Sequence, residues 1–398
     1  MERSNIALCP HNLCTGCGAC AAVCGKKAIE LTENEEGFLY PKINNATCVA
    51  CHQCQKICPV LEPVSRTNKG VCYAAWSLDN DIRTHSSSGG VFSELAYFII
   101  NAGGIVVGAS LDDTNGLVHH VIIRDVNDLS KIQGSKYVQS IVTPDVLREV
   151  RNTLRIGQKV LFTGTPCQVA GIISLTKNPE NLFTMDVVCH GVPSPKLFQQ
   201  VHKSVRNRIN NFINYNFRDL SSWSVCSNVN VNVNVNVNGV IVNKQLLGNE
   251  TFYQDAFLKG FLHRENCYQC QYASIERVSD ITVSDFWGIG NDKPITEDHK
   301  LGCSMLLINT IKGQKMFEGI KNRIYSEKRD IYETIDAGND QLKCPSKRPD
   351  ERNTFYQDAY CMTFSQLIKK YGLKYNSKPS LIIQVKSKIK SFFTKIFR

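Results

Sequence analysis

The chain has 398 residues, of which 42% are hydrophobic and 21% charged, a composition typical of a soluble globular protein with two or three domains. The formal net charge is +10, but residues 364–398 alone carry eight lysines, Arg398 and no acidic residue, whereas the rest of the chain has 37 basic and 36 acidic residues. Because this body is electrically balanced, we expect no nucleic-acid partner.

Two further features lead us to expect a cytoplasmic protein. The first residues do not resemble a signal peptide, and no apolar run approaches the roughly 20 residues of a membrane span. The 18 cysteines cluster at metal-binding spacings rather than spreading as in a disulfide framework. A reducing compartment keeps such thiols available for iron.

The strongest motif lies within residues 1–62. A CxxCxxCxxxC pattern occurs there twice, at 14–24 and 48–58, and Pro59 follows the second copy. Bacterial ferredoxins use this spacing to bind two [4Fe–4S] clusters: three thiolates of a run bind one cubane, and its fourth cysteine binds the other. We therefore assign cluster 1 to Cys14, Cys17, Cys20 and Cys58. Cluster 2 is assigned to Cys48, Cys51, Cys54 and Cys24.

Two other metal sites fit this stretch less well. The segment from Cys48 to His52 matches the CxxCH signature of covalent haem attachment, but this leaves Cys54 and Cys58 unexplained and requires export. A tetrahedral zinc site needs four ligands rather than eight in this repeat. The spacing therefore favours two iron–sulfur clusters.

Beyond a linker at about 60–70, expected strands alternate with expected helices. Strands are expected at 71–76, 105–109, 118–123, 159–163 and 182–188. Helices are expected at 91–100, 144–154 and 167–176. The expected fold class is a small α+β double-cluster ferredoxin domain followed by a larger mixed α/β domain, whose sheet order stays open.

A turn of small residues, Ser86 to Gly90, opens the helix expected at 91–100. Its backbone N–H groups, at the positive end of a helix dipole, would suit a phosphate group. A plain N-cap built from small residues is the alternative.

Four cysteines of the body could bind a third cubane. Cys167 and Cys189 each follow an expected strand, at the end where α/β folds build their sites, and Cys267 and Cys270 form a CxxC pair. The alternative is that Cys167 and Cys189 are small buried residues, as cysteines often are.

Catalytic roles for two residues of these segments are also open. Pro166-Cys167-Gln168 is similar to the nucleophile motif of DNA cytosine methyltransferases, but the chain lacks the N-terminal glycine-rich cofactor loop of that class. His190, beside Cys189, is a weak candidate for a general acid or base. A hydrogen-bonded structural histidine is the alternative.

Two further segments have regular patterns without catalytic chemistry. Residues 228–238 alternate Val and Asn, and with an Asn238-Gly239 turn they predict a hairpin, the alternative being a low-complexity insert. After Pro379, apolar residues recur at helical spacing and lysines lie between them. This pattern fits a helix at an anionic membrane surface or a helix that docks on protein.

The motifs together resemble the family of coenzyme F420 hydrogenase/dehydrogenase beta subunits, in its branch with an N-terminal double-cluster ferredoxin. The similarity covers about residues 8–345 and rests on segments 134–140, 164–168, 189–195, 267–270 and 279–288. Ser284 departs from the family pattern, since relatives commonly have Gly before Asp285-Phe286. We divide the chain into a ferredoxin-type domain (1–62), a family-like body (70–345, in parts of about 70–155 and 156–345) and a basic helical tail (346–398).

The resemblance implies a flavoprotein that binds FAD, with an iron–sulfur cluster beside the flavin. It strengthens the third-cluster interpretation of the four body cysteines. The flavin contacts that it implies are Ser87, Ser88, Gly89, Gly90, Ser135, Lys136, Tyr137 and Thr165.

We therefore expect an iron–sulfur flavoprotein oxidoreductase that passes electrons between ferredoxin-type clusters and a flavin. Some similar proteins are associated with polysaccharide synthesis. The expected partner is a redox protein or a small-molecule hydride donor or acceptor, with peripheral membrane contact through the tail. The alternatives are an electron-relay subunit without its own substrate and a cluster-stabilised binding module without flavin.

Overall fold

The computed structural model describes residues 6–67, 70–218, 223, 232–237, 240–297 and 299–377. The tail pattern after Pro379 lies outside these residues. In the part of the chain that the model describes, no helix is both long and apolar enough to cross a membrane.

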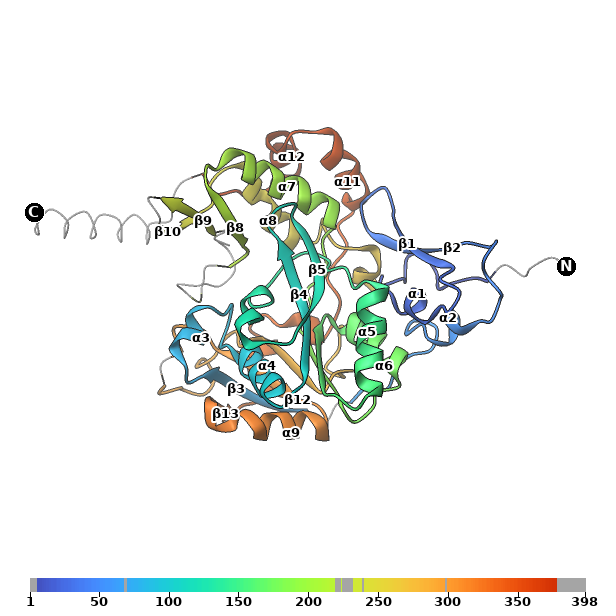
Figure 1. Cartoon of the computed structure of the whole chain (residues 1–398). Coiled ribbons are helices and arrows are strands. Elements are labelled where there is room, and N and C mark those ends of the chain that lie inside the picture. The colour runs from blue at the N-terminus through green and yellow to red at the C-terminus, as the bar shows by residue number, and fades with distance from the viewer. Residues whose placement is uncertain are drawn as a thin grey trace, which may run out of the picture.

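An eight-stranded mixed sheet forms the centre of the body, in the order β13-β3-β12-β11-β7-β6-β4-β5 (Figure 1). Its strands are β3 Val71–Ser77, β4 Ile105–Asp112, β5 Leu117–Ile123, β6 Val160–Gly164, β7 Leu182–Val187, β11 Ile281–Asp285, β12 Ser304–Ile308 and β13 Ile324–Lys328. β4, β6, β7 and β11 are parallel, and β3 runs in the same direction because β12 is antiparallel to both β11 and β3. The carboxyl ends of these five strands therefore lie on one edge of the sheet.

Helices cover both faces of this sheet. α4 (Val91–Asn101) and α9 (Ile311–Ile320) share one core with alternate residues of β4 and β6, such as Val106 and Leu161. α5 (Pro144–Arg155) and α6 (Pro166–Thr176) pack on the opposite residues. Burial on both faces explains the apolar runs in these strands.

Each strand and helix expected between residues 71 and 188 is present, so the mixed α/β prediction is confirmed. β4 extends beyond the expected 105–109 because its ladder with β5 continues to the pair Asp112–Leu117. The strand order became known only from the structure.

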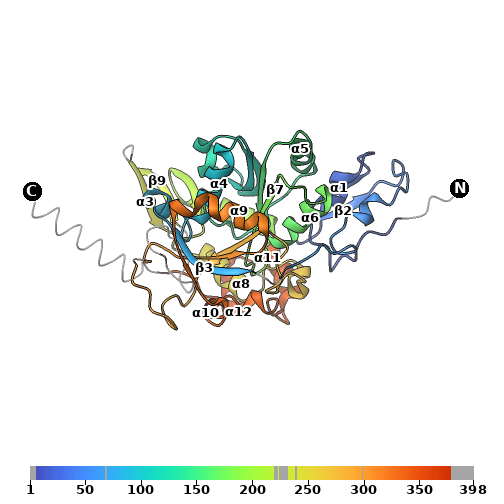
Figure 2. The ribbon, with the colours of Figure 1, turned by 90° about the horizontal axis from the view of Figure 1, so that it is seen from below.

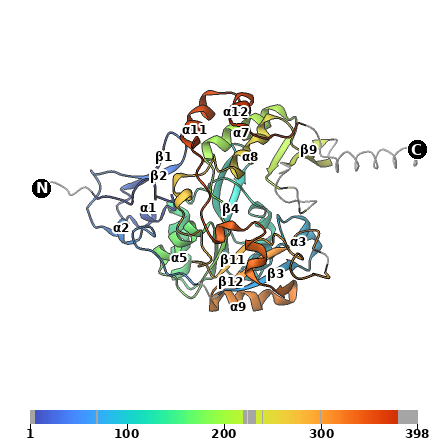
Figure 3. The ribbon, with the colours of Figure 1, turned by 180° about the vertical axis from the view of Figure 1, so that it is seen from behind.

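A second layer gathers around an aromatic core. It contains a three-stranded antiparallel sheet of β8 (Phe212–Asn216), β9 (Asn232–Val237) and β10 (Val240–Gln245). The predicted hairpin is confirmed, since Val237 pairs with Val240, although the turn residues 238–239 lie outside the described residues. The helices are α7 Pro195–Arg208, α8 Phe252–Leu258, α11 Arg352–Cys361 and α12 Phe364–Tyr371, which Figure 3 shows together.

Part of the predicted tail thus packs on the body. Phe355 and Tyr356 of α11 and Leu367 of α12 are buried in the aromatic core. The boundary at residue 346 stays a prediction, and the basic segment from 378 onward lies outside the described residues.

The remaining helical segments are α3 Asn80–Thr84, η1 Val126–Lys131, η2 Asn249–Thr251, η3 Glu265–Gln269, η4 Lys321–Arg323, α10 Ile331–Ile335 and η5 Asp340–Leu342.

The N-terminal module combines α1 (Ala19–Val23) and α2 (Gln53–Lys56) with an antiparallel pair, β1 (Ile29–Glu33) and β2 (Leu39–Ile43). It lies beside α5 and α6 (Figure 2), and Ala19 and Ala22 belong to the same core as these helices. A Cβ atom on Gly171 of α6 would lie 3.1 Å from the Cys17 Sγ. The module therefore packs closely against α6.

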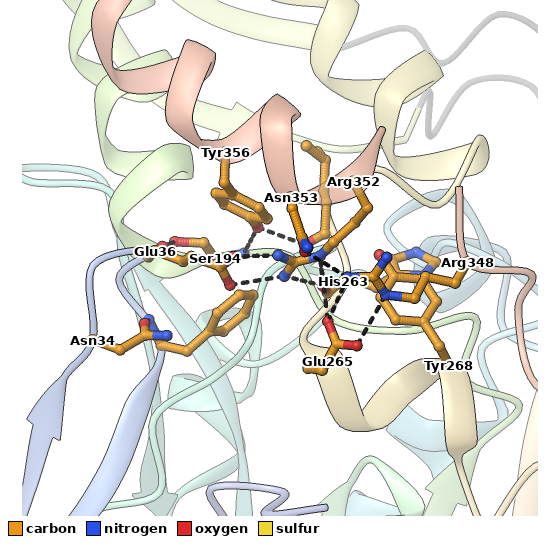
Figure 4. A network of polar contacts seen from close by, with 12 residues as sticks. Asn34, Glu36, Ser194, His263, Glu265, Tyr268, Arg348, Arg352, Asn353 and Tyr356 are labelled. Carbon is orange, nitrogen blue, oxygen red and sulfur yellow. Dashed lines mark hydrogen bonds and ion pairs between the residues drawn. The ribbon is translucent and has the colours of Figure 1, made fainter. Parts of the chain in front are cut away.

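The turn between β1 and β2 is bound to the body by a buried ion pair (Figure 4). The Arg352 guanidinium donates to both carboxylate oxygens of Glu36, and its Nη2 also donates to the His263 carbonyl at 2.8 Å. Arg352 is 1% exposed, so this interaction is largely shielded from solvent. The Tyr360 hydroxyl donates to the Glu36 carbonyl at 2.7 Å.

We predict that Glu36→Ala destabilises the protein by about 3 kcal/mol, because it leaves the buried Arg352 cation without its main partner. The iron-loaded protein should unfold at a lower urea concentration. Glu35→Ala is the matched control, since Glu35 is exposed and its carboxylate forms no ion pair among the described residues. Equal unfolding midpoints for the two variants would contradict a role for this ion pair in attaching the module.

Candidate iron–sulfur and cofactor sites

The cysteines assigned to cluster 1 lie together. Cys14, Cys17, Cys20 and Cys58 line one cavity with Pro59. Gly16 and Gly18 have φ values of 68° and 78°, a left-handed conformation that favours glycine and lets the loop fold tightly between the thiols. Burial, together with the charges of Cys14 and Cys58, raises the pKa of Cys17 to about 12. Such crowded thiols become thiolates most readily when bound to metal.

Cys9 is a residue of this cavity that the sequence motif did not identify. Hydrogen bonds to Cys14 and Cys58 raise its own pKa, and the same bonds lower the pKa of both partners to about 6. For Cys14, burial opposes this shift and the charge of Arg264 supports it. The only sequence signal was the position of Cys9 shortly before the first run.

The residues assigned to cluster 2 form a second group nearer the surface. Burial raises the pKa of Cys54, and the charges of Cys51 and Cys48 raise it further, as expected for neighbouring thiols. Cys24 packs with Cys54 in one small apolar cluster, and its Sγ accepts a hydrogen bond from the Ala28 N–H at 3.3 Å. Cys51 is exposed.

The four body cysteines line a single cavity at the carboxyl edge of the sheet. Cys167 lies in the first turn of α6, directly after β6, and Cys189 follows the adjacent parallel strand β7. Cys267 lies in η3 and Cys270 directly follows it. Burial, together with the charge of Cys270, raises the pKa of Cys167 and Cys189 to about 12.

This cavity differs from a site for one metal ion. Within the described residues, no three His, Cys, Asp or Glu side chains are grouped as ligands of a single ion. In a cubane each thiolate binds a different iron, so its four cysteines surround a larger group. Four cysteines that line one cavity, with Cys267 buried and the other three partly buried, fit that chemistry.

Thr165, one of the residues implied as flavin contacts, lines the same cavity. Its hydroxyl lies 3.1 Å from the Cys167 Sγ, and its backbone N–H donates to the Gln168 side chain at 3.0 Å. With Pro166 at the first helical position, these contacts fix the start of α6 and the position of Cys167.

His190 also lines this cavity. Its ring lies 5.1 Å from that of His263, and its Nε2 is 3.4 Å from the Leu258 carbonyl. Burial lowers the pKa of His190, which favours the neutral form. An acid–base role for His190 stays a prediction.

The two segments implied as flavin contacts meet each other. The turn of Ser87 to Gly90 follows β3, and the Ser135 N–H donates to the Ser87 Oγ at 2.9 Å. The turn packs on the start of β12: the Ser88 hydroxyl donates to the Cys303 carbonyl, and the Gly89 N–H donates to the Ser304 Oγ, both at 3.0 Å. Gly90, with φ 82°, leads into α4.

Lys136 directly follows Ser135, which contacts Ser87. Its ammonium group forms no ion pair with a carboxylate of the described residues. Its Nζ donates to the Gln133 carbonyl at 2.6 Å. Burial lowers the pKa of Lys136 to about 7, although the charge of Asp113 opposes the shift. A partly buried, unpaired ammonium group beside a helix-opening turn fits a phosphate-bearing cofactor.

Tyr137 belongs to a polar and aromatic assembly that sequence reasoning missed. Its hydroxyl accepts from Arg218 at 3.2 Å, and Arg218 forms an ion pair with Asp285 at 2.7 Å. Trp223 also donates to Asp285 at 2.8 Å and stacks on Trp287. Asp285 is at the carboxyl end of β11, within a segment that carried the family resemblance, but its partner Arg218 had no sequence signal.

Family models match three segments of the chain. The chain matches the 4Fe-4S dicluster domain at residues 13–61. It matches the coenzyme F420 hydrogenase/dehydrogenase beta subunit N-terminal model at 72–148 and the corresponding C-terminal model at 157–334. The two beta-subunit matches together span well over half of the chain.

Two curated relatives are similar over part of their length. A subunit of the F(420)H(2) dehydrogenase of Methanosarcina mazei is 27% identical over 212 residues, which are 48% of this chain and 59% of that protein. A polyferredoxin-like protein of Methanocaldococcus jannaschii is 45% identical over 58 residues, covering 13% of this chain and 34% of that protein.

A chain in the solved F420-reducing [NiFe] hydrogenase complex of Methanosarcina barkeri is 19% identical, with a TM-score of 0.47, and the match covers 72% of this chain and 90% of that chain. The family models carry the assignment, because they match the dicluster module and both parts of the body in sequence order. The chain belongs to the family of coenzyme F420 hydrogenase/dehydrogenase beta subunits and has an N-terminal 4Fe-4S dicluster domain.

Proposed function

We propose that this chain is an iron–sulfur oxidoreductase subunit in which three [4Fe–4S] clusters pass electrons to or from a flavin. The observation that carries the proposal is the proximity of two cysteine cavities. Thr15 lines both the cavity of Cys14, Cys17, Cys20 and Cys58 and the cavity of the four body cysteines. The proposed cluster 1 and the proposed body cluster thus occupy adjacent cavities with a shared lining residue.

The same contacts support an order for the relay. Cys17 lies against Gly171, one turn along α6 from Cys167, and the charge of Cys167 raises the pKa of Cys17. Cluster 2 includes the exposed Cys51 and lies on the outer side of the module. The order cluster 2, cluster 1, body cluster therefore connects the surface to the interior, with a redox protein as the partner at the exposed end.

FAD, when bound, can exchange single electrons with an iron–sulfur cluster and can also transfer a hydride, which a cluster cannot do. Ser87, Ser135 and the turn before α4 are the residues that would hold it, and Lys136 would pair with its phosphates. Tyr137 would lie along the same site through its contact with Arg218. The roles in polysaccharide synthesis and in membrane contact stay predictions, since no described residue bears on them.

The third cluster predicts an iron content of about 12 per chain for the anaerobically purified protein. Cys167→Ala with Cys270→Ala should reduce it to about 8, because the remaining two thiols cannot hold a cubane. Cys344→Ala with Cys361→Ala is the matched double control, since both cysteines are exposed and lie outside the cavities, and it should retain about 12. An unchanged count in the first variant would exclude the body cluster.

FAD binding should weaken as the pH rises above about 7. Lys136 is protonated below its lowered pKa and pairs with phosphate in that form, so the ammonium group and its contribution are lost at higher pH. The dissociation constant, measured by FAD titration of the flavin-depleted, iron-loaded protein, should increase by up to about tenfold per pH unit over this window.

Lys136→Met should bind FAD more weakly and without this pH dependence, while Lys131→Met, which removes an exposed ion-paired lysine, should behave as wild type. The same pH dependence in Lys136→Met would contradict the phosphate contact. A purified protein without flavin that takes up no added FAD would contradict the flavoprotein proposal and leave an iron–sulfur relay.

A further inference from the structure

A single arginine connects the segments that carry the two groups of cysteines. Arg264 directly precedes η3, which carries Cys267, and its Nε donates to the Cys14 carbonyl at 2.8 Å. Its Nη1 donates to the Gln139 Oε1 at 3.2 Å, and the Gln139 amide in turn donates to the Thr15 carbonyl at 3.1 Å. One side chain therefore contacts the cluster 1 loop from the segment that holds the body cysteines.

The Arg264 guanidinium forms no ion pair with a carboxylate of the described residues. The side chain is fully buried. The neighbouring Glu265 pairs with Arg348 at 2.9 Å, a different guanidinium. Within the described structure the Nη2 of Arg264 is buried and has no hydrogen-bond acceptor. An isolated buried cation is costly unless negative charge compensates it.

Aromatic rings account for part of this compensation. The guanidinium carbon lies 3.9 Å from the centre of the Tyr40 ring and 5.5 Å from that of Phe38. Such contacts stabilise a desolvated cation by less than the burial of a full charge costs. The other negative groups nearby are the thiolates, and the charge of Arg264 acts on Cys14 and Cys167, one from each cavity.

We propose that Arg264 is the shared counter-ion of cluster 1 and the body cluster and raises the reduction potentials of both. This inference rests on the proposed third cluster. Each one-electron reduction makes a cluster one unit more negative, so a fixed positive charge between two clusters stabilises the reduced form of each. Arginine suits this role because it stays protonated and holds several hydrogen bonds in a fixed plane.

The electron transfer then needs no proton. When an electron leaves reduced cluster 1, that cluster is oxidised by one unit and the body cluster is reduced by one unit. The positive charge of Arg264 lies near cluster 1 and the body cluster both before and after the transfer. It therefore raises the reduction potentials of the two clusters together. An equal shift of both potentials leaves the driving force of the transfer unchanged.

The test is an equilibrium redox titration of the anaerobic, iron-loaded full chain, followed by electron paramagnetic resonance. The double Cys167→Ala, Cys270→Ala variant identifies the body-cluster signal by its loss. Arg264→Gln should lower the equilibrium constant for reduction of cluster 1 and of the body cluster about tenfold. For a one-electron couple this corresponds to a reduction potential about 59 mV lower. The cluster 2 potential should stay unchanged.

Two controls separate charge from structure. Arg264→Lys keeps the charge and should stay close to wild type in both potentials. Arg348→Gln removes a nearby guanidinium that is already paired with Glu265 and should shift neither. If Arg264→Gln lost iron, the charge-preserving variant Arg264→Lys would be the test. An Arg264→Lys protein that retains its iron but whose reduction equilibria are shifted tenfold would overturn the counter-ion role.

The outcomes also distinguish this inference from the proposed function. A wild-type iron content of about 8 would overturn the third cluster itself. Full iron content in Arg264→Gln with unchanged potentials for both clusters would overturn the role of Arg264 and leave the three-cluster relay intact.

Discussion

Close packing of the cluster 1 loop against the body is the contact on which the rest of the arrangement depends. Gly171 lets Cys17 approach α6, and Arg264 and Gln139 bind the carbonyls of Cys14 and Thr15. The Glu36–Arg352 pair attaches the same module at its other end. Two attachment points restrict rotation of the module, so the distance between the two cysteine cavities is set by packing rather than by a flexible linker.

The direction of the strands explains why the candidate sites lie on one side of the body. β3, β6, β7 and β11 end at the same edge, and there they deliver the turn of Ser87 to Gly90, Cys167, Cys189 and Asp285. This is the edge at which α/β sheets commonly build ligand sites. The turn of Ser87 to Gly90 and the body cysteines therefore lie along the same edge of the sheet.

Much of this could be predicted from the sequence, for identifiable reasons. The elements between 71 and 188 have clear apolar periodicity and were found, and the cysteines of each site share spacings that metal chemistry dictates. The short strands β11 to β13 were not predicted, although α9 lies between β12 and β13. The sheet order depends on contacts between distant residues, which periodicity does not encode.

The polar residues around the sites were the least predictable. Arg264 and Gln139 are far apart in sequence, and an arginine in a loop is usually exposed, so only tertiary packing reveals that Arg264 is buried. The same holds for Arg218 and Asp285, which meet across 67 residues. Lys136 was implied by resemblance, but its lowered pKa follows from burial that the sequence did not indicate.

The most direct test of the relay is magnetic coupling between cluster 1 and the body cluster in the fully reduced protein. Two paramagnetic clusters in adjacent cavities should broaden and split each other's electron paramagnetic resonance signals. The cluster 1 signal should therefore change shape when Cys167 and Cys270 are replaced by alanine. A cluster 1 signal that is identical with and without an occupied body site would contradict the proposed path.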